Sequence, residues 1–361
     1  MKIILGADLV PFGVSEPYFI EGNLEKLFGD VLPILQGADR LIVNLECALT
    51  TYDGAITKCG PNLKASPACA DTLPKLGVTE VLLSNNHTFD YGIVGLRDTM
   101  ENLERVGIPY IGVGENDTDS RKIYYFEDSG KRFAIVNVCE HEYSYALPNR
   151  MGTNPYNPYL TMHDIREAKK NADIVLVIYH GGKEFCRYPS PRLRLLCHEM
   201  VECGADVVIT QHSHCIGCFE EYEGGKILYG QGNFHFAMPF SREGWFTSLI
   251  VELEIGDTIK WNFYPTRLNL EEGEIRLATG TDGETIMNAF YARNEELKNG
   301  KWLDGWRAFC EGELSYKTAV SRMYNPDSTA YQNELLAHYL DCEAHTDVLR
   351  ELFKTWHHTK E

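Results

Sequence analysis

Six hydrophobic runs between residues 2 and 214 each stop at polar residues, and amphipathic stretches lie between them. The runs are KIILGAD, RLIVNLE, EVLLSNNH, RFAIVNVCEH, DIVLVIYHGG and DVVITQHSH. Each has the character of a β-strand. Stretches 92–106 and 191–203 instead repeat apolar residues at spacings of three and four, which indicates helices. This alternation predicts a layered α/β domain whose polar turns lie at the carboxyl ends of strands, where α/β sheets bind ligands.

The last of these runs ends in two histidines, His212 and His214, which are separated by one serine. Side chains two positions apart on an extended segment share a face. The two imidazoles are therefore expected to converge on one point, and convergent imidazoles at a strand end suggest a metal ion.

The size and charge of the chain limit its partners. With 361 residues, 44% of them hydrophobic, it can bury a sizeable core. Its 52 acidic and 34 basic side chains give a net charge of −18, which repels nucleic acid and anionic lipid at long range. The apolar stretches are far shorter than the roughly 20 residues of a membrane span. We therefore expect no nucleic-acid partner and no transmembrane segment.

The N-terminus and the cysteines indicate a cytoplasmic protein. The opening residues, MKIILGADLV, contain an apolar run that is too short for a secretory signal. The chain has 11 cysteines, an odd number, scattered from Cys47 to Cys342. This distribution fits reduced thiols better than a disulfide framework. The single C-x-x-C, at Cys215 and Cys218, indicates zinc or redox chemistry only weakly.

The pattern changes towards the C-terminus. The segments FTSLIVELEI and TIKWNFYPTRL predict an antiparallel hairpin that turns at 256–257. After about residue 282 the sequence becomes helical and rich in aromatic residues. We therefore divide the chain into a domain at 1–280 and a helical extension at 281–361. The extension would pack on the domain, cover its cleft or form a homodimer interface.

Polar residues at the ends of the predicted strands include many that bind metals. Five separate strands bring such groups to one edge of the sheet. The candidates are Asp8, Asn44, Glu46, Asn85, Asn86, His87, Asp90, Glu140, His141, Glu142, His180, His212 and His214. Each alone has a structural explanation, such as a turn former, a helix cap or a core histidine. Their recurrence at the same strand end favours a site for one or two ions of Mn²⁺, Fe²⁺ or Zn²⁺, which accept imidazole together with carboxylate.

The order of these motifs resembles a known family. The chain has Asp8, NLE at 44–46, NNHTFDYGIVGLRDT at 85–99, HGGKE at 180–184, GADVVITQHSH at 204–214 and ILYGQGNFHF at 227–236. Together they are similar to the capsule-synthesis, poly-γ-glutamate biosynthesis family CapA, which belongs to the calcineurin-like metallophosphatase superfamily. The resemblance covers about residues 1–240. It implies a four-layer α/β/β/α sandwich, followed here by the helical extension.

The resemblance also implies roles for individual residues. The metal ligands would be Asp8, Glu46, Asn86, His180, His212 and His214, with Glu46 at the bridging position. His87 would be the catalytic acid beside the site rather than a ligand, and Asp90 belongs to the same NNH-x-x-D motif. Candidate substrate-binding residues are Lys64, Glu184 and Asn233, which match family positions, and Asn44, Glu140 and His141, which are chosen from their strand-end positions.

The sequence departs from the superfamily at one metal ligand. Val10 stands where a histidine usually follows the first aspartate by two residues, so one metal site has one ligand fewer. The first hypothesis is a metal-dependent hydrolase of a phosphoester or of an acidic polymer such as poly-γ-glutamate. The second is a non-catalytic accessory or binding protein in the synthesis of that polymer. The retained histidines favour the first, and Val10 favours the second.

An acidic substrate conflicts with the net charge of the chain, because a long-range field of the same sign slows its approach. A local basic patch would overcome this. Lys58, Lys64 and Lys183 lie in predicted strand-end loops and would form such a patch, although solvated surface charge explains any one of them equally well.

Overall fold

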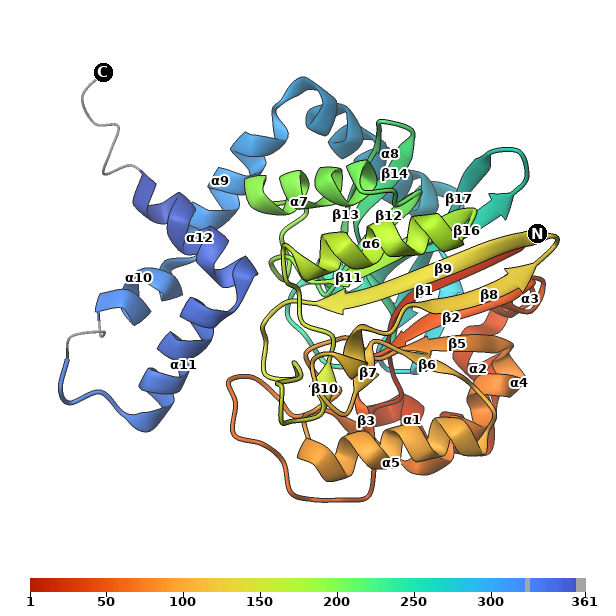
Figure 1. Cartoon of the computed structure of the whole chain (residues 1–361), viewed down its shortest axis with the longest axis horizontal. Coiled ribbons are helices and arrows are strands. Elements are labelled where there is room, and N and C mark those ends of the chain that lie inside the picture. Colours follow the sequence, from red (N-terminus) through yellow and green to blue (C-terminus); the bar gives the residue numbers. More distant parts are fainter. Residues whose placement is uncertain (322–324, 355–361) are drawn as a thin grey trace.

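A computed structural model describes residues 1–321 and 325–354, and two β-sheets form its centre (Figure 1). The eight-stranded sheet has the order β18 (Glu274–Leu277), β17 (Ile259–Asn269), β16 (Thr247–Ile255), β1 (Lys2–Val10), β2 (Arg40–Leu45), β5 (Val78–Leu82) and β6 (Tyr110–Ile111), and β15 (Asn233–Phe236) pairs with β1. The six-stranded sheet has the order β13 (Ile216–Tyr222), β14 (Gly225–Gln231), β12 (Val207–Gln211), β11 (Ile174–His180), β9 (Lys131–Cys139) and β8 (Tyr124–Asp128). The hairpin of β16 and β17 confirms the predicted turn at 256–257.

The central strands of both sheets run parallel, so their carboxyl ends meet. In the first sheet β1, β2 and β5 are parallel, and Asp8 pairs in register with Asn44. In the second sheet β9, β11 and β12 are parallel, and His180 pairs with Gln211. Two short two-stranded sheets lie in the loops, β3 (Ala48–Leu49) with β4 (Lys64–Ala65) and β7 (Val113–Gly114) with β10 (Gly152–Thr153).

The two sheets pack face to face because successive residues of their central strands point to opposite faces of the sheet and are apolar on both. In β11, Leu176 and Ile178 join a buried cluster that also contains Ile3 and Leu5 of β1. Val177, which points to the opposite face, joins a different cluster. A strand buried on both faces reads as a continuous hydrophobic run, which explains the uninterrupted apolar sequences.

Helices cover the outer face of each sheet. The first sheet is covered by α1 (Glu16–Glu21), α2 (Leu24–Phe28), α3 (Leu32–Gln36), α4 (Leu73–Leu76) and α5 (Gly92–Arg105). The second is covered by α6 (Leu160–Asn171) and α7 (Pro191–Glu202). The four layers confirm the predicted α/β/β/α sandwich. One expectation is corrected: the polar strand ends come from two sheets rather than from one edge of a single sheet.

The C-terminal part is helical, as predicted. It consists of α8 (Gly280–Asn299), α9 (Trp302–Gly312), α10 (Leu314–Ser321), α11 (Ala330–Asp341) and α12 (Glu343–Lys354). Phe290 of α8 is buried in the cluster between the sheets, whereas Trp306, Tyr316 and Val348 form a separate core among the later helices. The division at residue 280 and the homodimer interface stay predictions.

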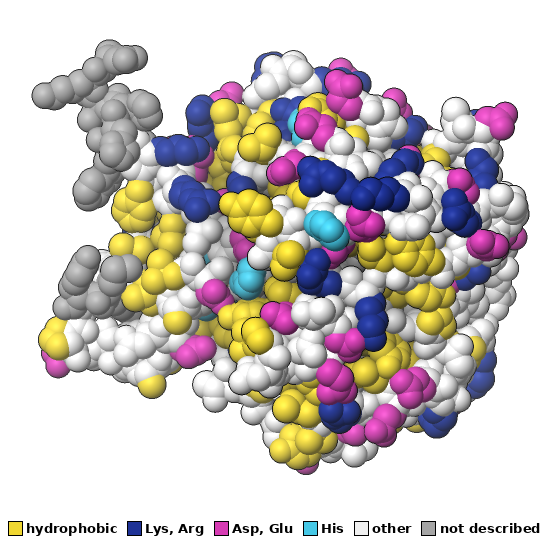
Figure 2. Space-filling view, in the orientation of Figure 1, with side chains coloured by type: hydrophobic (Ala, Val, Ile, Leu, Met, Phe, Trp, Pro, Cys, Tyr) yellow, Lys and Arg dark blue, Asp and Glu magenta, His cyan; other side chains and the backbone are white. Residues whose placement is uncertain are grey.

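The outer surface carries mixed charge. Figure 2 shows acidic and basic side chains interspersed over the face in view. None of the helices within 1–321 and 325–354 is both long and apolar enough to cross a membrane, as the sequence predicts.

Candidate metal centre

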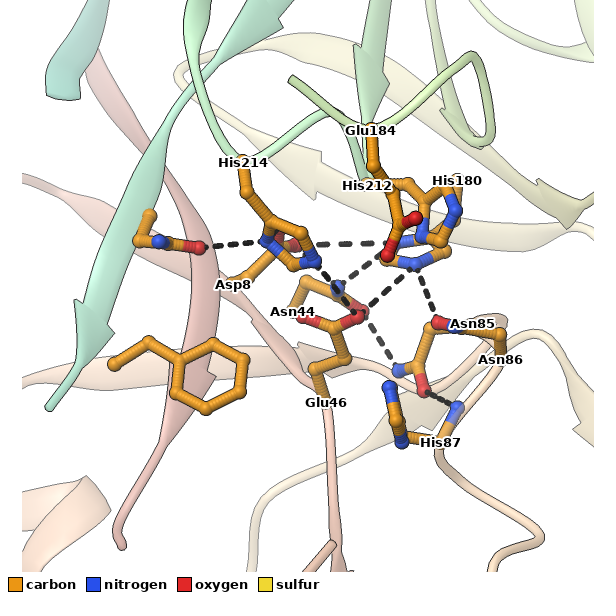
Figure 3. Close-up of polar contacts among 12 residues, drawn as sticks. Asp8, Asn44, Glu46, Asn85, Asn86, His87, His180, Glu184, His212 and His214 are labelled. Atoms are coloured by element: carbon orange, nitrogen blue, oxygen red, sulfur yellow. Dashed lines mark hydrogen bonds and ion pairs between the residues drawn. The ribbon is translucent and has the colours of Figure 1, made fainter. Parts of the chain in front are cut away.

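The predicted metal-binding side chains converge where the carboxyl ends of the two sheets meet (Figure 3). Asp8 lies in β1, and Glu46 directly follows β2. His180 ends β11, while His212 and His214 follow β12. All five side chains are buried. Both His212 and His214 have positive φ angles, 81° and 50°, so the chain bends sharply after β12 as it carries the imidazoles inwards.

Glu46 lies at the middle of this cluster. Its Oε1 is 3.4 Å from Nε2 of His180 and 3.9 Å from Nε2 of His214. Asp8 Oδ2 is 3.4 Å from Nδ1 of His214. Two sets of potential ligand atoms, each within 4.8 Å of one another, share this glutamate: one set is Asp8, Glu46 and His214, and the other is Glu46, His180 and His212. The bridging position implied for Glu46 agrees with this geometry.

Several polar atoms of the cluster are buried without a hydrogen-bond partner among the described residues. They are Asp8 Oδ2, both carboxylate oxygens of Glu46 and Nδ1 of His212. Leaving carboxylate oxygens buried and unpaired costs several kcal/mol unless a cation binds them. Carboxylate oxygen and imidazole nitrogen are the donors that Mn²⁺, Fe²⁺ and Zn²⁺ accept. The residues present therefore fit one or two such ions.

Three asparagines orient the candidate ligands. Asn44 donates to Asp8 Oδ1 at 2.7 Å and accepts from Asn85 at 2.9 Å. Asn233 Oδ1 is 2.8 Å from Nδ1 of His214. When Nδ1–H donates to this oxygen, the lone pair lies on Nε2, which faces Glu46. Asn44 and Asn233, predicted as substrate-binding residues, thus hold the candidate ligands Asp8 and His214 in place, and substrate contact stays a prediction.

Asn86 lies at the edge of the centre. Its Oδ1 is 2.9 Å from Nε2 of His180, so the amide oxygen and the imidazole nitrogen face the same space. This position is compatible with its implied role as a ligand.

The charges of the centre depend on one another. Burial and the neighbouring Asp8 carboxylate raise the pKa of Glu46 to about 7. Burial opposes protonation of His214, but the carboxylates of Glu46 and Asp8 outweigh it and raise the pKa of His214 to about 10. Burial lowers the pKa values of His180 and His212 to about 4. A proton on His214 thus balances part of the negative charge in the metal-free centre.

Metal binding at this centre should release protons. At pH 7 His214 is protonated and Glu46 is close to half protonated, whereas ligands must be deprotonated. Affinity should therefore rise with pH above 7, up to about tenfold per pH unit for each proton released. Calorimetric titration of Mn²⁺ or Zn²⁺ in two buffers of different ionisation enthalpy counts these protons. We expect about one or more per chain at pH 7, and a release of none would contradict the charge arrangement.

His87 lies beside the centre in a separate network. Its Nδ1 is 2.7 Å from Asp90 Oδ2 and 3.1 Å from Nζ of Lys58, which also pairs with Asp90. Burial raises the pKa of Asp90, but His87 and Lys58 more than offset this and hold it below its usual value. Asp90 Oδ2 also accepts the backbone N–H of Leu63 at 2.6 Å. The imidazole is therefore held through Nδ1, and its other nitrogen remains available for proton transfer.

The structure places the other predicted substrate-binding residues in different surroundings. Glu184 lies beside the His180 and His212 pair (Figure 3), and its carboxylate is 3.1 Å from Nζ of Lys183. Lys64 pairs with the exposed Asp53 at 2.6 Å. Substrate binding by these residues stays a prediction.

Glu140 and His141 hold the C-terminal helices. Glu140 accepts hydrogen bonds from Arg192 at 2.8 Å and from the backbone N–H of Ala344 at 3.2 Å. His141 pairs with Glu343 at 2.7 Å. These contacts give both residues a structural role that the sequence did not indicate, and a role in substrate binding stays a prediction.

One residue beside the centre was missed as a site residue. The sequence predicts Lys58 only as part of a basic patch, yet its side chain is 2% exposed and contacts both His87 and Asp90. Glu142, one of the strand-end candidates, is 3.2 Å from Nε2 of His212. Val10, which replaces the usual histidine, lies fully buried in the apolar cluster beneath α1–α5.

Comparison with known proteins gives one family match. The family model described as "Bacterial capsule synthesis protein PGA_cap" matches residues 14–238. Asp8 and the helices from α8 onwards lie outside the matched range. The match therefore includes every candidate metal ligand except Asp8.

Two curated relatives cover much of the chain. The capsule biosynthesis protein CapA of Bacillus anthracis is 30% identical over 264 residues, which are 71% of this chain and 64% of that protein. The PGA biosynthesis protein CapA of Bacillus subtilis (strain 168) is 30% identical over 224 residues, which are 60% of this chain and 58% of that protein. The chain thus spans less than two thirds of the length of either relative.

A solved structure of a putative 5′-nucleotidase from Staphylococcus aureus, in complex with α-ketoglutarate, is also similar. It shares 17% identity with this chain at a TM-score of 0.45, and the alignment covers 73% of this chain and 52% of that one.

Proposed function

The chain belongs to the bacterial capsule synthesis protein PGA_cap family, and from this premise we propose that it is a metal-dependent hydrolase. The observation that carries the proposal is the buried centre in which Glu46 is shared by two sets of candidate ligands. Its carboxylate oxygens have no hydrogen-bond partner among the described residues. The His214 imidazolium balances part of this charge without metal, and a divalent ion would pair the oxygens directly.

Each candidate ligand has a part in this proposal. Asp8, Glu46 and His214 would hold one ion, and Glu46, His180 and His212 would hold a second, with Asn86 next to His180. Divalent ions held there supply a bound water of lowered pKa and neutralise charge that grows on the attacked centre. Asn44 and Asn233 keep the Asp8 carboxylate and the His214 ring in place.

His87 supplies the proton for the leaving group. Asp90 holds the imidazole through Nδ1, so a proton on Nε2 can be delivered to the leaving atom. The buried ammonium of Lys58 contacts both residues and places a positive charge next to the site. This charge favours an anionic substrate.

The substrate class that best fits is an anionic phosphoester or the amide of an acidic polymer such as poly-γ-glutamate. The relatives are described as capsule biosynthesis and PGA biosynthesis proteins, which favours the polymer. Lys58 and Lys183 are buried cations near the centre, but Asp90 and Glu184 pair with them, so divalent ions in the centre would be the main positive charge that an anionic substrate meets.

The first experiment combines metal content with hydrolysis. The chain is purified without chelator, loaded with Mn²⁺, Fe²⁺ or Zn²⁺, and analysed for metal per chain. The loaded protein is then assayed against p-nitrophenyl phosphate esters and γ-glutamyl polymers. Metal-dependent release of product, lost in His212→Ala together with metal, is the expected result. Full metal loading without hydrolysis of either class would reject the hydrolase.

The second candidate is a metal-binding accessory protein without catalysis. Val10 favours it, because the histidine that superfamily enzymes place there is replaced by a buried apolar side chain. In this case the metal-loaded chain would bind γ-glutamyl polymer without shortening it. Equilibrium binding of the polymer, followed by analysis of its length, separates the two candidates.

A further inference from the structure

A second group of metal-binding side chains lies where the C-terminal helices meet the loop after β9. It consists of Glu142, His338 and His345, each of which offers one ligand atom within 4.8 Å of the others. Glu142 Oε1 is 3.5 Å from Nε2 of His338, and the two imidazole rings are 4.3 Å apart. The side chains of His338 and Glu142 are only 8% and 12% exposed, and His345 is buried.

The break between two helices brings the histidines together. His338 lies in α11 and His345 in α12, and Cys342 between the helices has an extended backbone with ψ of 131°. A continuous helix would place residues seven apart about 10 Å from each other along its axis. The bend instead turns both rings towards Glu142.

The loop that carries Glu142 is fixed to the same helices. Glu343 accepts hydrogen bonds from the backbone and Nδ1 of His141 at 2.9 and 2.7 Å. Tyr145 donates to Asp341 at 2.9 Å. These contacts lie on both sides of Glu142 in the sequence, so the three members of the group belong to one connected structure.

Two aromatic side chains orient the imidazoles. The hydroxyl of Tyr316 lies 2.5 Å from Nδ1 of His345, which leaves Nε2 of this ring as the available ligand atom. The ring of Tyr143 stacks on His338 at 4.9 Å. A partner on the second ring nitrogen is a usual feature of metal-binding histidines.

We propose that Glu142, His338 and His345 form a further binding site for a divalent transition-metal ion, with zinc as the best-fitting ion. Two imidazoles and one carboxylate with an open position are a donor set that binds Zn²⁺. Two lysines act on the group electrostatically, and both are paired with carboxylates, Lys183 with Glu184 at 3.1 Å and Lys58 with Asp90 at 2.5 Å. The site joins the C-terminal helices to the first centre through Glu142, which also lies 3.2 Å from His212.

The new site is separate from the proposed hydrolase function. His338 and His345 lie outside residues 14–238, which the family model matches, and they take no part in the two ligand sets around Glu46. The extension would therefore supply two ligands of a further metal position, next to a first centre whose candidate ligands all come from the sandwich.

The test is zinc stoichiometry of the full chain. Zinc is added to chelator-treated protein, unbound metal is removed, and zinc per chain is measured for wild type and for His338→Ala, His338→Gln and His345→Ala. Each variant should bind one ion fewer than wild type. Tyr316→Phe should weaken the last bound ion about tenfold, because it removes the partner of His345. Equal stoichiometry and affinity in wild type and in folded variants would overturn the proposal.

Two controls distinguish this site from the first centre. His198→Ala removes a histidine of α7, which pairs with Glu220 of β13, and should leave zinc binding unchanged. His214→Ala should reduce occupancy of the first centre only. If the variants at 338 and 345 fail to fold, anomalous diffraction from zinc-soaked wild-type crystals decides. A peak between the three side chains supports the site, and an empty site beside an occupied first centre rejects it.

Discussion

His87→Ala is expected to lower the rate of hydrolysis by about 10²–10⁴-fold while leaving the metal content unchanged. The reason lies in its contacts, because Nδ1 of His87 is engaged with Asp90 and Lys58 and takes no part in the ligand sets around Glu46. Removing the ring removes a proton donor and leaves the ligands in place. Turnover is measured with a substrate found in the screen, and metal by elemental analysis of the same sample.

The variant needs two comparisons. His198→Ala, which removes an imidazole from α7 far from this network, should leave turnover unaltered. Asp90→Asn should keep the ring but remove the carboxylate that holds Nδ1, so turnover should fall while metal content stays the same. A His87→Ala protein with wild-type turnover would show that the leaving group is protonated by another residue or by water.

The convergence of the candidate ligands could be predicted from the sequence because parallel strands end at a common place. Asp8 and His180 lie at the ends of recognisable hydrophobic runs, and strand periodicity aims their side chains inwards. His212 and His214 reach the same place from a bend at positive φ after β12, and not from the extended segment that the sequence predicts. The hairpin of β16 and β17 could be predicted for a similar reason, since alternating apolar residues flank a short turn of three residues, 256–258. These signals are local in the sequence. The number of sheets depends on pairing between distant strands, so local signals do not predict it.

Contacts between distant segments could not be predicted. Lys58 sits in a loop without periodicity, and its burial against His87 and Asp90 depends on how that loop folds back over the sheet. The strand-end position of Glu140 predicts substrate contact, whereas in the structure Glu140 binds Arg192 and the first turn of α12. The helical pattern of the extension predicts helices but not where they dock. For this reason Glu142, His338 and His345 emerge as a group only in three dimensions.

Glu46→Gln is expected to abolish the stabilisation that metal in the first centre gives to the wild-type chain. Glu46 belongs to both ligand sets, so its loss should empty both positions or weaken them strongly. An ion present at 1,000 times its dissociation constant stabilises a protein by about 4 kcal/mol. Wild-type protein should therefore melt several degrees higher with Mn²⁺ or Zn²⁺ than with chelator, whereas the variant should lose most of this difference.

The same substitution should have the opposite effect without metal. The pKa of Glu46 rises from 4.5 in the unfolded chain to about 7 in the folded one, so folding favours the protonated form. The stability of metal-free protein is then greatest below pH 4.5, as far as this group is concerned, and falls as pH rises towards 7. Above pH 7 the ionised carboxylate lowers the free energy of unfolding by roughly 3 kcal/mol. A glutamine at this position is neutral and avoids this loss of stability. At pH 8 in chelator, Glu46→Gln should therefore melt at the same temperature as wild type or higher.

A second buried carboxylate, Glu220, serves as the control for the opposite effects of Glu46→Gln with and without metal. Glu220 is also largely buried, but Arg194, His198 and Tyr229 satisfy it. Glu220→Gln should lower the melting temperature equally with metal and with chelator, because it removes paired interactions far from the centre. If Glu46→Gln behaved in the same way, Glu46 would be an ordinary structural carboxylate and the binuclear centre would be wrong. A metal-dependent change of sign, seen only at Glu46, requires a carboxylate that is unfavourable until a cation binds it.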